Sequence, residues 1–403
     1  FEMYTDHEDF AVRTLGMPGL GALGATFGRV VAMDSPSARP KGQFHWASTL
    51  RHEVAHVVTL SMSNTRVPRW LTEGLSMVDE RAGGPGWGDD LSIAYIRAWE
   101  GGELLPLADL NSGFVRPKSG EQLSLSYLQA GWVCEYLEET FGMERIREML
   151  IQYGEGKATA EVFKEVLGKT VEEVDADFNT KMDQKLKPLA ERLEEPTEPI
   201  EGREALEAAL LEKPDSYILN LEMARILISE DQKPEAVPYL RKAIELFPQH
   251  AGPNSPYPLL VRVLLDNGEE EEAIGVLQAW WHRAPLSIEN AFQLSELLRK
   301  YSRLEEAART LEEALYLDPL SPELHQNLGT LYMELGKTET AVREFKVLLT
   351  LNPVDRANAH YNLAKALSQT GQPSEARRQV LLSLEIAPGF DDAQRLLLEL
   401  VRQ

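Results

Sequence analysis

The sequence has a single cysteine, Cys134, among 403 residues. An internal disulfide is therefore impossible, and the redox compartment stays undecided. Long apolar runs are also missing, since none approaches the roughly 20 residues that a membrane-spanning helix needs. Basic residues are scarce, with 41 Lys and Arg against 64 Asp and Glu, which gives a formal charge of −23. Such a charge argues against nucleic acid and against anionic membrane surfaces as partners.

The length exceeds that of one ordinary core, so two or more domains are expected. The chain begins at Phe1 without a methionine or a signal peptide, as a processed or trimmed product would. A stretch rich in Pro and Glu over residues 187–202 interrupts the helical pattern. We expect a linker there, between a first domain over residues 1–186 and a second over residues 203–403.

The first domain contains the segment T-L-R-H-E-V-A-H-V-V over residues 49–58. In a helix, His52 and His56 lie about one turn apart on the same face. Two imidazoles at this spacing can bind one divalent cation, and zinc is the usual choice for nitrogen and carboxylate ligands. Glu53 would lie beside the metal without binding it, where it could take a proton from a water that the metal acidifies. On these residues alone, an ordinary surface helix explains the pattern equally well.

A candidate third ligand, Glu73, follows 17 residues after His56. A loop rich in Ser, Asn and Pro over residues 61–68 allows the chain to reverse before a second helix begins near Trp70. Glu73 in the first turn of that helix would complete a set of His, His and Glu and leave a fourth position for water. Alternatively, Glu73 is a helix-start carboxylate that faces the helix dipole. Its apolar neighbours favour the ligand role, because a buried carboxylate needs a partner.

The two histidines, followed by W-L-T-E-G-L at residues 70–75, resemble the gluzincin zinc metallopeptidases. The similarity is greatest to the bacterial branch called peptidase MA-like. This resemblance implies an α+β, zincin-like catalytic domain. It also implies that His52, His56 and Glu73 bind Zn2+ and that Glu53 is the general base of peptide hydrolysis.

The same resemblance implies roles for residues beyond the metal ligands. In that family an acidic residue four positions after the ligand glutamate often holds a histidine; Met77 is in this position here, and Glu80 is a substitute on the same helical face. A tyrosine before an apolar helix donates a hydrogen bond to the reaction oxyanion in the family, which assigns this role to Tyr127. A core tyrosine with a satisfied hydroxyl is the alternative for Tyr127. Tyr136 is the weaker candidate, because its position favours the helix core.

Residues 1–47 are predicted to form strands and turns, with a β-rich segment over residues 24–34 shortly before the zinc helix. In the resembled family the corresponding strand pairs with the extended backbone of the substrate. An ordinary sheet strand is the alternative. The Gly-Ala-Met-Glu-Asn motif, with which related aminopeptidases grip a free amino terminus, is absent from the sequence. An endopeptidase is therefore favoured.

The second half of the chain contains an internal repeat. Alanine and proline each recur at intervals of 37, 34, 34 and 35 residues, namely Ala236, Ala273, Ala307, Ala341 and Ala376, and Pro248, Pro285, Pro319, Pro353 and Pro388. A small residue where two helices touch, and a proline that closes the second helix, are typical of tetratricopeptide (TPR) repeats. The pattern predicts an all-α solenoid with a half repeat over residues 203–213, about five repeats and a terminal helix over residues 391–402.

The inner, concave face of such a solenoid generally binds a peptide or a protein segment. Polar residues of the first helices are candidates for these contacts, although a solvated face explains them equally well: Asn220, His325, Asn327, His360 and Asn362. Trp132, Trp280 and Trp281 are either partner-binding or core residues, and the core is favoured.

Two functions remain open. In the first, the chain is a zinc-dependent endopeptidase whose repeats recruit a protein or peptide substrate or a partner protein. In the second, it is a TPR interaction scaffold with a catalytically weak or silent peptidase-like domain. The presence of His52, His56, Glu73 and Glu53 favours the first function, whereas Met77 keeps the second open.

Overall fold

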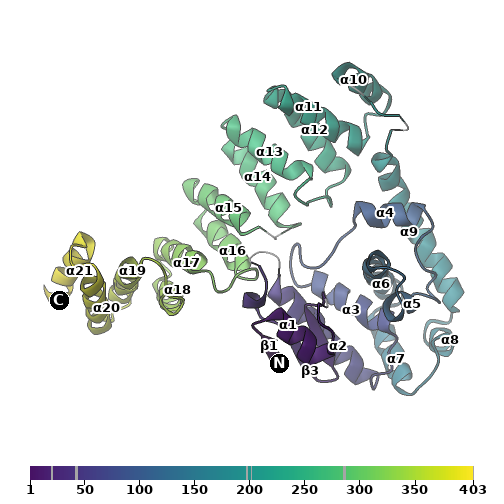
Figure 1. Ribbon diagram of the computed structural model, residues 1–403, viewed down its shortest axis with the longest axis horizontal. Helices are drawn as coiled ribbons and strands as arrows, with labels where there is room; N and C mark the ends of the chain where they lie inside the picture. The colour runs from purple at the N-terminus through teal and green to yellow at the C-terminus, as the bar shows by residue number, and fades with distance from the viewer. Residues whose placement is uncertain (20, 41–43, 197, 201, 285–286, 403) are drawn as a thin grey trace. The chain divides into compact units, whose positions relative to one another are not determined.

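The computed structural model describes residues 1–403 except 20, 41–43, 197, 201, 285–286 and 403. The chain forms two compact units, in which helices dominate (Figure 1). The first unit comprises Phe1–Ser35 and Ala47–Ala284, and the second comprises Pro36–Trp46 and Pro285–Gln403. The predicted division at residues 187–202, which rests on the Pro- and Glu-rich break in the helical pattern, stays a prediction.

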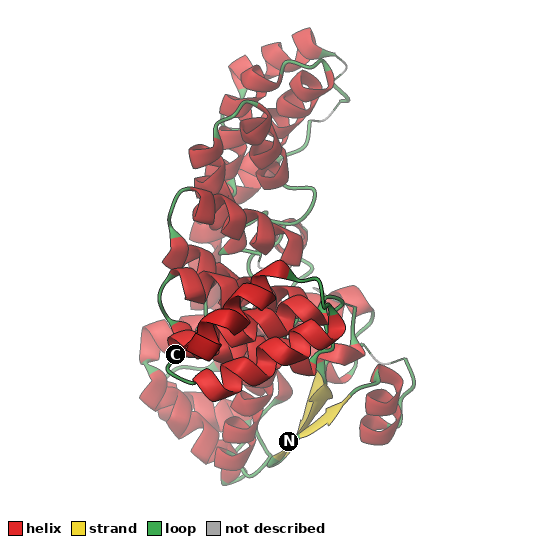
Figure 2. Ribbon diagram, turned by 90° about the vertical axis from the view of Figure 1, so that its left-hand side faces the viewer, coloured by secondary structure: helices red, strands yellow, loops and turns green. Residues whose placement is uncertain are grey.

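The prediction of an α+β first domain is wrong. In the described residues the only strands are β1 (Glu2–Tyr4), β2 (Gly24–Phe27) and β3 (Val30–Asp34). They form one small sheet of order β1-β3-β2, with β1 parallel and β2 antiparallel to β3. Figure 2 shows these strands together, surrounded by a chain that is otherwise helices and loops.

Local features keep the sheet small. Gly28 has a φ of 62°, a left-handed conformation that suits glycine, so the β-rich segment folds back as the hairpin of β2 and β3 instead of one strand. Between β1 and β2, the Asp6 side chain accepts a hydrogen bond from the Asp9 N–H and thereby caps α1 (His7–Phe10). A π-helical turn, Ala11–Leu15, follows directly. Much of the predicted strand-and-turn region is therefore helical.

Three helices build the frame of the candidate site. α2 (Trp46–Met62) and α3 (Arg69–Arg81) are joined by a tight reversal in which Asn64 and Thr65 adopt φ values of 48° and 61°. α3 packs against α6 (Gly120–Phe141). Gly74 permits this close approach, because a Cβ at that position would lie 2.3 Å from the carbonyl oxygen of Ala130.

The other helices of this region enclose a buried core beneath α3 and α6. Phe163 is fully buried and packs against Trp70 of α3, with 6.5 Å between the ring centroids. The last of these helices, α9 (Val171–Leu193), continues through Pro188, so the first part of the predicted linker is helical. The helices are α4 (Ile93–Glu100), α5 (Ser112–Val115), α7 (Met143–Gly154), α8 (Thr159–Val162) with the π-helical turn Phe163–Leu167, and α9 (Val171–Leu193).

The repeat region begins with α10 (Arg203–Glu212), continues in helix pairs and ends with α21 (Asp391–Arg402). The recurring alanine of each pair has no exposed surface, because a small side chain lets the two helices approach closely. No described helix combines the length and the apolar character needed to cross a membrane. The pairs are α11 (Tyr217–Ser229) with α12 (Lys233–Leu246), α13 (Pro256–Asp266) with α14 (Glu270–Trp281), α15 (Ile288–Lys300) with α16 (Leu304–Ala314), α17 (Pro322–Glu334) with α18 (Thr338–Thr350), and α19 (Arg356–Gln369) with α20 (Pro373–Ile386).

The second unit also includes the segment Pro36–Trp46, which precedes the rest of α2. The Trp46 backbone N–H donates to the carbonyl of Tyr316 and its indole N–H donates to the carbonyl of Leu315, each at 3.1 Å. Both bonds lie within the second unit and join Trp46 to the residues that follow α16.

Candidate metal centre

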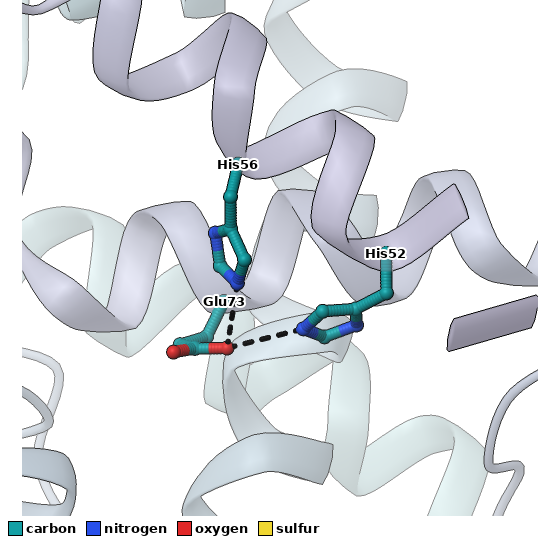
Figure 3. A group of neighbouring side chains, drawn as sticks. All are labelled: His52, His56 and Glu73. Carbon is teal, nitrogen blue, oxygen red and sulfur yellow. Dashed lines mark hydrogen bonds and ion pairs between the residues drawn. The ribbon is translucent and has the colours of Figure 1, made fainter. Parts of the chain in front are cut away.

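The helical spacing of α2 places His52 and His56 side by side on one face (Figure 3). Their ring centroids are 4.9 Å apart and the rings are nearly perpendicular. His56 is buried and His52 is half-buried. The two Nε2 atoms therefore point to a common, largely enclosed position.

Glu73 reaches the same position from α3. Its Oε2 atom lies 3.3 Å from Nε2 of His52 and 3.2 Å from Nε2 of His56. One ligand atom from each of the three residues lies within 4.8 Å of the others. Glu73 itself is only 1% exposed, so its carboxylate needs partners of opposite charge or hydrogen-bond donors. The structure thus brings together the three predicted ligands.

The other ring nitrogens are held by side chains of α3. Nδ1 of His52 lies 3.2 Å from Oε2 of Glu80, and Nδ1 of His56 lies 2.8 Å from Oγ1 of Thr72. In the tautomer that leaves Nε2 free for a metal, each Nδ1–H donates to these oxygens. Glu80 therefore contacts His52, as expected of a substitute for the acidic residue that is absent at position 77. A metal-binding histidine is normally oriented by such a partner.

The charged side chains around the centre also favour the binding of a cation. Burial lowers the pKa of His52, but its hydrogen bonds to Glu73 and Glu80 outweigh this effect and raise the pKa to about 10. Burial raises the pKa of Glu73, whereas hydrogen bonds from His52 and His56 hold it well below the usual range. Two carboxylates thus favour positive charge beside His52. Two neutral imidazoles and one carboxylate are a donor set that fits zinc.

Glu53, the predicted general base, is turned toward the sheet. Oγ1 of Thr26 donates to Oε2 of Glu53 at 2.6 Å, and Glu53 is only 5% exposed. Gly24 touches the same side chain, because a Cβ there would lie 2.7 Å from Cγ of Glu53. Both residues belong to β2, an edge strand of the sheet. The edge strand therefore sets the position of the Glu53 carboxylate.

Tyr127, the predicted oxyanion donor, lies on α6 and is half-buried. Burial and the negative charge of Glu73 raise its pKa to about 12, although Arg69 opposes this shift as a positive charge and a hydrogen-bond partner. The hydroxyl is therefore protonated near neutral pH and close to both Glu73 and Arg69. Tyr136, the weaker candidate, is a core residue that packs edge-to-face against Phe178.

Three residues at the centre are absent from the sequence-based prediction. Thr26 and Thr72 hold Glu53 and His56, and Nε of Arg69 donates to Oε1 of Glu73 at 2.6 Å. Arg69 precedes Glu73 by four residues on one helix, and this spacing is a usable signal for an ion pair. The contacts of the two threonines join different elements, and the sequence contains no local signal for them.

Most polar candidates in the repeats have structural partners. Asn220 is buried and donates to the carbonyls at positions 214 and 216 of its own segment. Nδ1 of His325 lies 2.8 Å from Oε2 of Glu344, and Nδ1 of His360 lies 2.7 Å from Oε1 of Gln379. These three candidates therefore stabilise helices of the repeats.

The remaining candidates differ in exposure. Asn327 and Asn362 are half-buried, and Asn327 lines a groove of about 290 Å³ together with residues of α15 and α17. Trp132 and Trp281 are buried, as core residues are, and the half-buried Trp280 donates its indole N–H to a backbone carbonyl at 2.7 Å. Asn327 also donates to a carbonyl of its own helix, that of Glu323, at 2.9 Å. Contact of Asn327 and Asn362 with a partner stays a prediction.

Two parts of the chain match known protein families. Residues 41–184 match the family described as Peptidase MA superfamily. Residues 219–250, 310–343 and 327–392 match families described as tetratricopeptide repeat. No curated protein was found to match the sequence.

Several solved structures are similar to part of the chain. YrrB, a TPR protein with an unusual peptide-binding site, is 20% identical, covers 47% of this chain and 96% of its own, and has a TM-score of 0.36. MamA is 17% identical, with coverages of 42% and 90% and a TM-score of 0.33. TTC0263, a thermophilic TPR protein in Thermus thermophilus, is 23% identical, with coverages of 46% and 100% and a TM-score of 0.29. The family matches identify a Peptidase MA superfamily domain and tetratricopeptide repeats in this chain, and such repeats generally serve protein–protein interaction.

Proposed function

We propose that this protein is a TPR interaction scaffold whose Peptidase MA domain is a zinc-dependent peptidase, with endopeptidase action favoured. The repeat matches support protein binding directly. Peptide hydrolysis is the finer proposal, and a single observation carries it. Nε2 of His52, Nε2 of His56 and a carboxylate oxygen of Glu73 converge on one enclosed position.

The proposed chemistry assigns a task to each side chain of the centre. When bound by His52, His56 and Glu73, zinc would polarise a substrate carbonyl and acidify water at the site. Glu53 would accept a proton from the attacking water and pass it to the leaving amine. The Tyr127 hydroxyl would donate a hydrogen bond to the oxyanion. Because each task needs a different group, the proposal makes separate predictions for these residues.

The edge strand β2 supports the binding of an extended substrate. In the sheet order β1-β3-β2, β2 pairs with β3 on one side only. An extended peptide can add to such an edge through main-chain hydrogen bonds. Since Thr26 of β2 contacts Glu53, a peptide on this strand would lie beside the proposed base.

The first prediction concerns metal content and hydrolysis. We expect near one zinc per chain in protein never exposed to chelator, and loss of that zinc in His56→Ala, because the variant lacks one of three ligands. The Glu53→Gln variant is expected to keep its zinc and to lose hydrolysis, since an amide cannot take the proton. Elemental mass spectrometry and cleavage of an unbiased peptide library measure the two properties.

The second candidate function, a scaffold with a silent peptidase-like domain, gives a different result. The wild-type protein would then cleave no peptide, and Glu53→Gln would leave its binding of partner proteins unchanged. Absence of zinc from both wild-type protein and His56→Ala would contradict the metal centre itself.

A further inference from the structure

Arg69 lies at the candidate centre although it is neither a predicted ligand nor the predicted base. It is the first residue of α3 and follows Pro68 directly. Its Nε donates to Oε1 of Glu73 at 2.6 Å, while Oε2 of the same carboxylate faces His52 and His56. A single carboxylate thus separates the Arg69 guanidinium from the position on which the three ligands converge.

The Arg69 side chain is far more exposed than the carboxylate that it contacts. The side chain of Arg69 is 61% exposed, whereas that of Glu73 is only 2% exposed. A guanidinium has five N–H donors. Glu73 takes the Nε donor, and the Tyr127 hydroxyl lies close to the guanidinium. Arg69 therefore has donors available on its exposed side, next to the proposed oxyanion donor.

The charge around Arg69 explains why an exposed cation matters here. Glu53, Glu73 and Glu80 place three carboxyl groups in or beside the centre. Without a positive group, a substrate carboxylate near the scissile bond would be repelled. A planar guanidinium binds a carboxylate through two parallel hydrogen bonds, which an amide or a hydroxyl cannot imitate.

We infer that Arg69 binds a carboxylate of the substrate, so that this protein selects peptides with an acidic residue or a free carboxyl terminus close to the scissile bond. The inference rests on the proposed function, because it names the substrate class of the same site. It gives Arg69 a role in specificity that is separate from holding Glu73. The two roles differ in their consequences: a residue that only orients Glu73 would affect acidic and neutral peptides equally.

The experiment measures peptide binding without turnover. Zinc-loaded full-length protein carrying Glu53→Gln is titrated with two sets of fluorescent, end-blocked hexapeptides. One set has Glu at each position in turn, and the matched set has Gln there. Fluorescence anisotropy gives the dissociation constants. The same titration is made with Arg69→Gln and Arg69→Lys, each added to Glu53→Gln.

Arg145→Gln is the matched control. Arg145 on α7 is 53% exposed and donates to Oε2 of Glu148 at 2.8 Å, so it is an exposed, carboxylate-paired arginine outside the centre. The zinc content of every variant is measured alongside. If Arg69→Gln loses zinc, Arg69→Lys decides the result, because lysine keeps the charge near Glu73 without the planar fork.

With Arg69 present, we expect a Glu peptide to bind about tenfold or more tightly than its Gln counterpart at one position of the set. Arg69→Gln should abolish this preference, Arg69→Lys should retain part of it, and Arg145→Gln should retain all of it. Equal binding of both sets by protein with Arg69, equal weakening of both sets by Arg69→Gln, or no binding of either set would overturn the inference. A zinc-loaded wild-type protein that binds the Glu peptides and cleaves none would instead refute the proposed peptidase activity.

Discussion

At the scale of residues, the candidate centre depends on side chains that hold other side chains in place. Glu80 and Thr72 orient His52 and His56 through Nδ1, and Thr26 holds Glu53. These contacts fix which nitrogen of each imidazole is available and where the proposed base lies. A substitution that leaves every ligand unchanged can therefore disable the site.

Gly24→Ala tests this dependence. A Cβ at position 24 would lie 2.7 Å from both Cγ and Oε1 of Glu53, which is too close for any real contact, so the carboxylate must shift. We expect unchanged zinc content and a fall in kcat of about 100-fold, the usual cost of misplacing a catalytic group by about 1 Å. Gly21→Ala is the control, because a Cβ there has no neighbour within 4 Å. Full activity in Gly24→Ala would mean that Glu53 does not need this position.

At the scale of elements, short-range sequence patterns explain why the helices of the centre were predicted and the size of the sheet was not. The 3.6-residue period determines that His52 and His56 share a face of α2, and the apolar residues near Glu73 indicate a buried α3. Both depend on residues within a few positions of one another. The β-rich segment predicted over residues 24–34 contains β2 and β3. The small size of the sheet could not be predicted in this way, because it depends on pairing between distant segments and on turns such as the one at Gly28.

A buried pair between α17 and α18 makes an element-scale prediction about pH. Burial lowers the pKa of His325, but its hydrogen bond to Glu344 raises it above the ordinary 6.5. Burial raises the pKa of Glu344, but hydrogen bonds from His325 and Arg343 lower it below the ordinary 4.5. The raised histidine pKa stabilises the fold below pH 6.5, and this contribution is lost as the pH rises through the folded pKa. The lowered glutamate pKa stabilises the fold above pH 4.5, and this contribution is lost as the pH falls.

The pair should therefore contribute most to the free energy of unfolding between pH 4.5 and 6.5. We expect His325→Gln to lower the unfolding temperature most in that window, by an amount that corresponds to about 1–3 kcal/mol, because Glu344 loses its buried partner and keeps only the exposed Arg343. The difference from wild type should shrink in alkaline solution. Thermal unfolding followed by circular dichroism over a pH series measures it, with the exposed His282→Gln as the control. A difference that is constant over the series would contradict the charged pair.

At the scale of the whole molecule, all three candidate ligands belong to the first compact unit. Metal binding should therefore stabilise that unit, since a ligand that binds only the folded state adds about 2.7 kcal/mol at 100 times its Kd. The helices α17–α20 of the second unit contain none of these ligands.

Chelator makes this expectation measurable. We expect EDTA to lower the protection of amide hydrogens in α2 and α3 against exchange, and to leave the protection in α17–α20 unchanged. Hydrogen exchange followed by mass spectrometry resolves the two regions. In His56→Ala, EDTA should have no effect in either region. Equal loss of protection throughout the wild-type chain would show that the metal centre is not a local feature of the first unit.

The sequence by itself determined what depends on near neighbours along the chain. It indicated the helices of the centre, the three candidate ligands and the repeat period, because helical faces and repeats are written at fixed short spacings. Only the tertiary structure decided the small size of the sheet, the contact of Thr72 with His56, the contact of Thr26 with Glu53 and the exposed position of Arg69. Thr26 and Glu53 are 27 residues apart, and His56 and Thr72 are 16 apart. Such contacts follow from how separate elements pack, and no local pattern in the sequence encodes them.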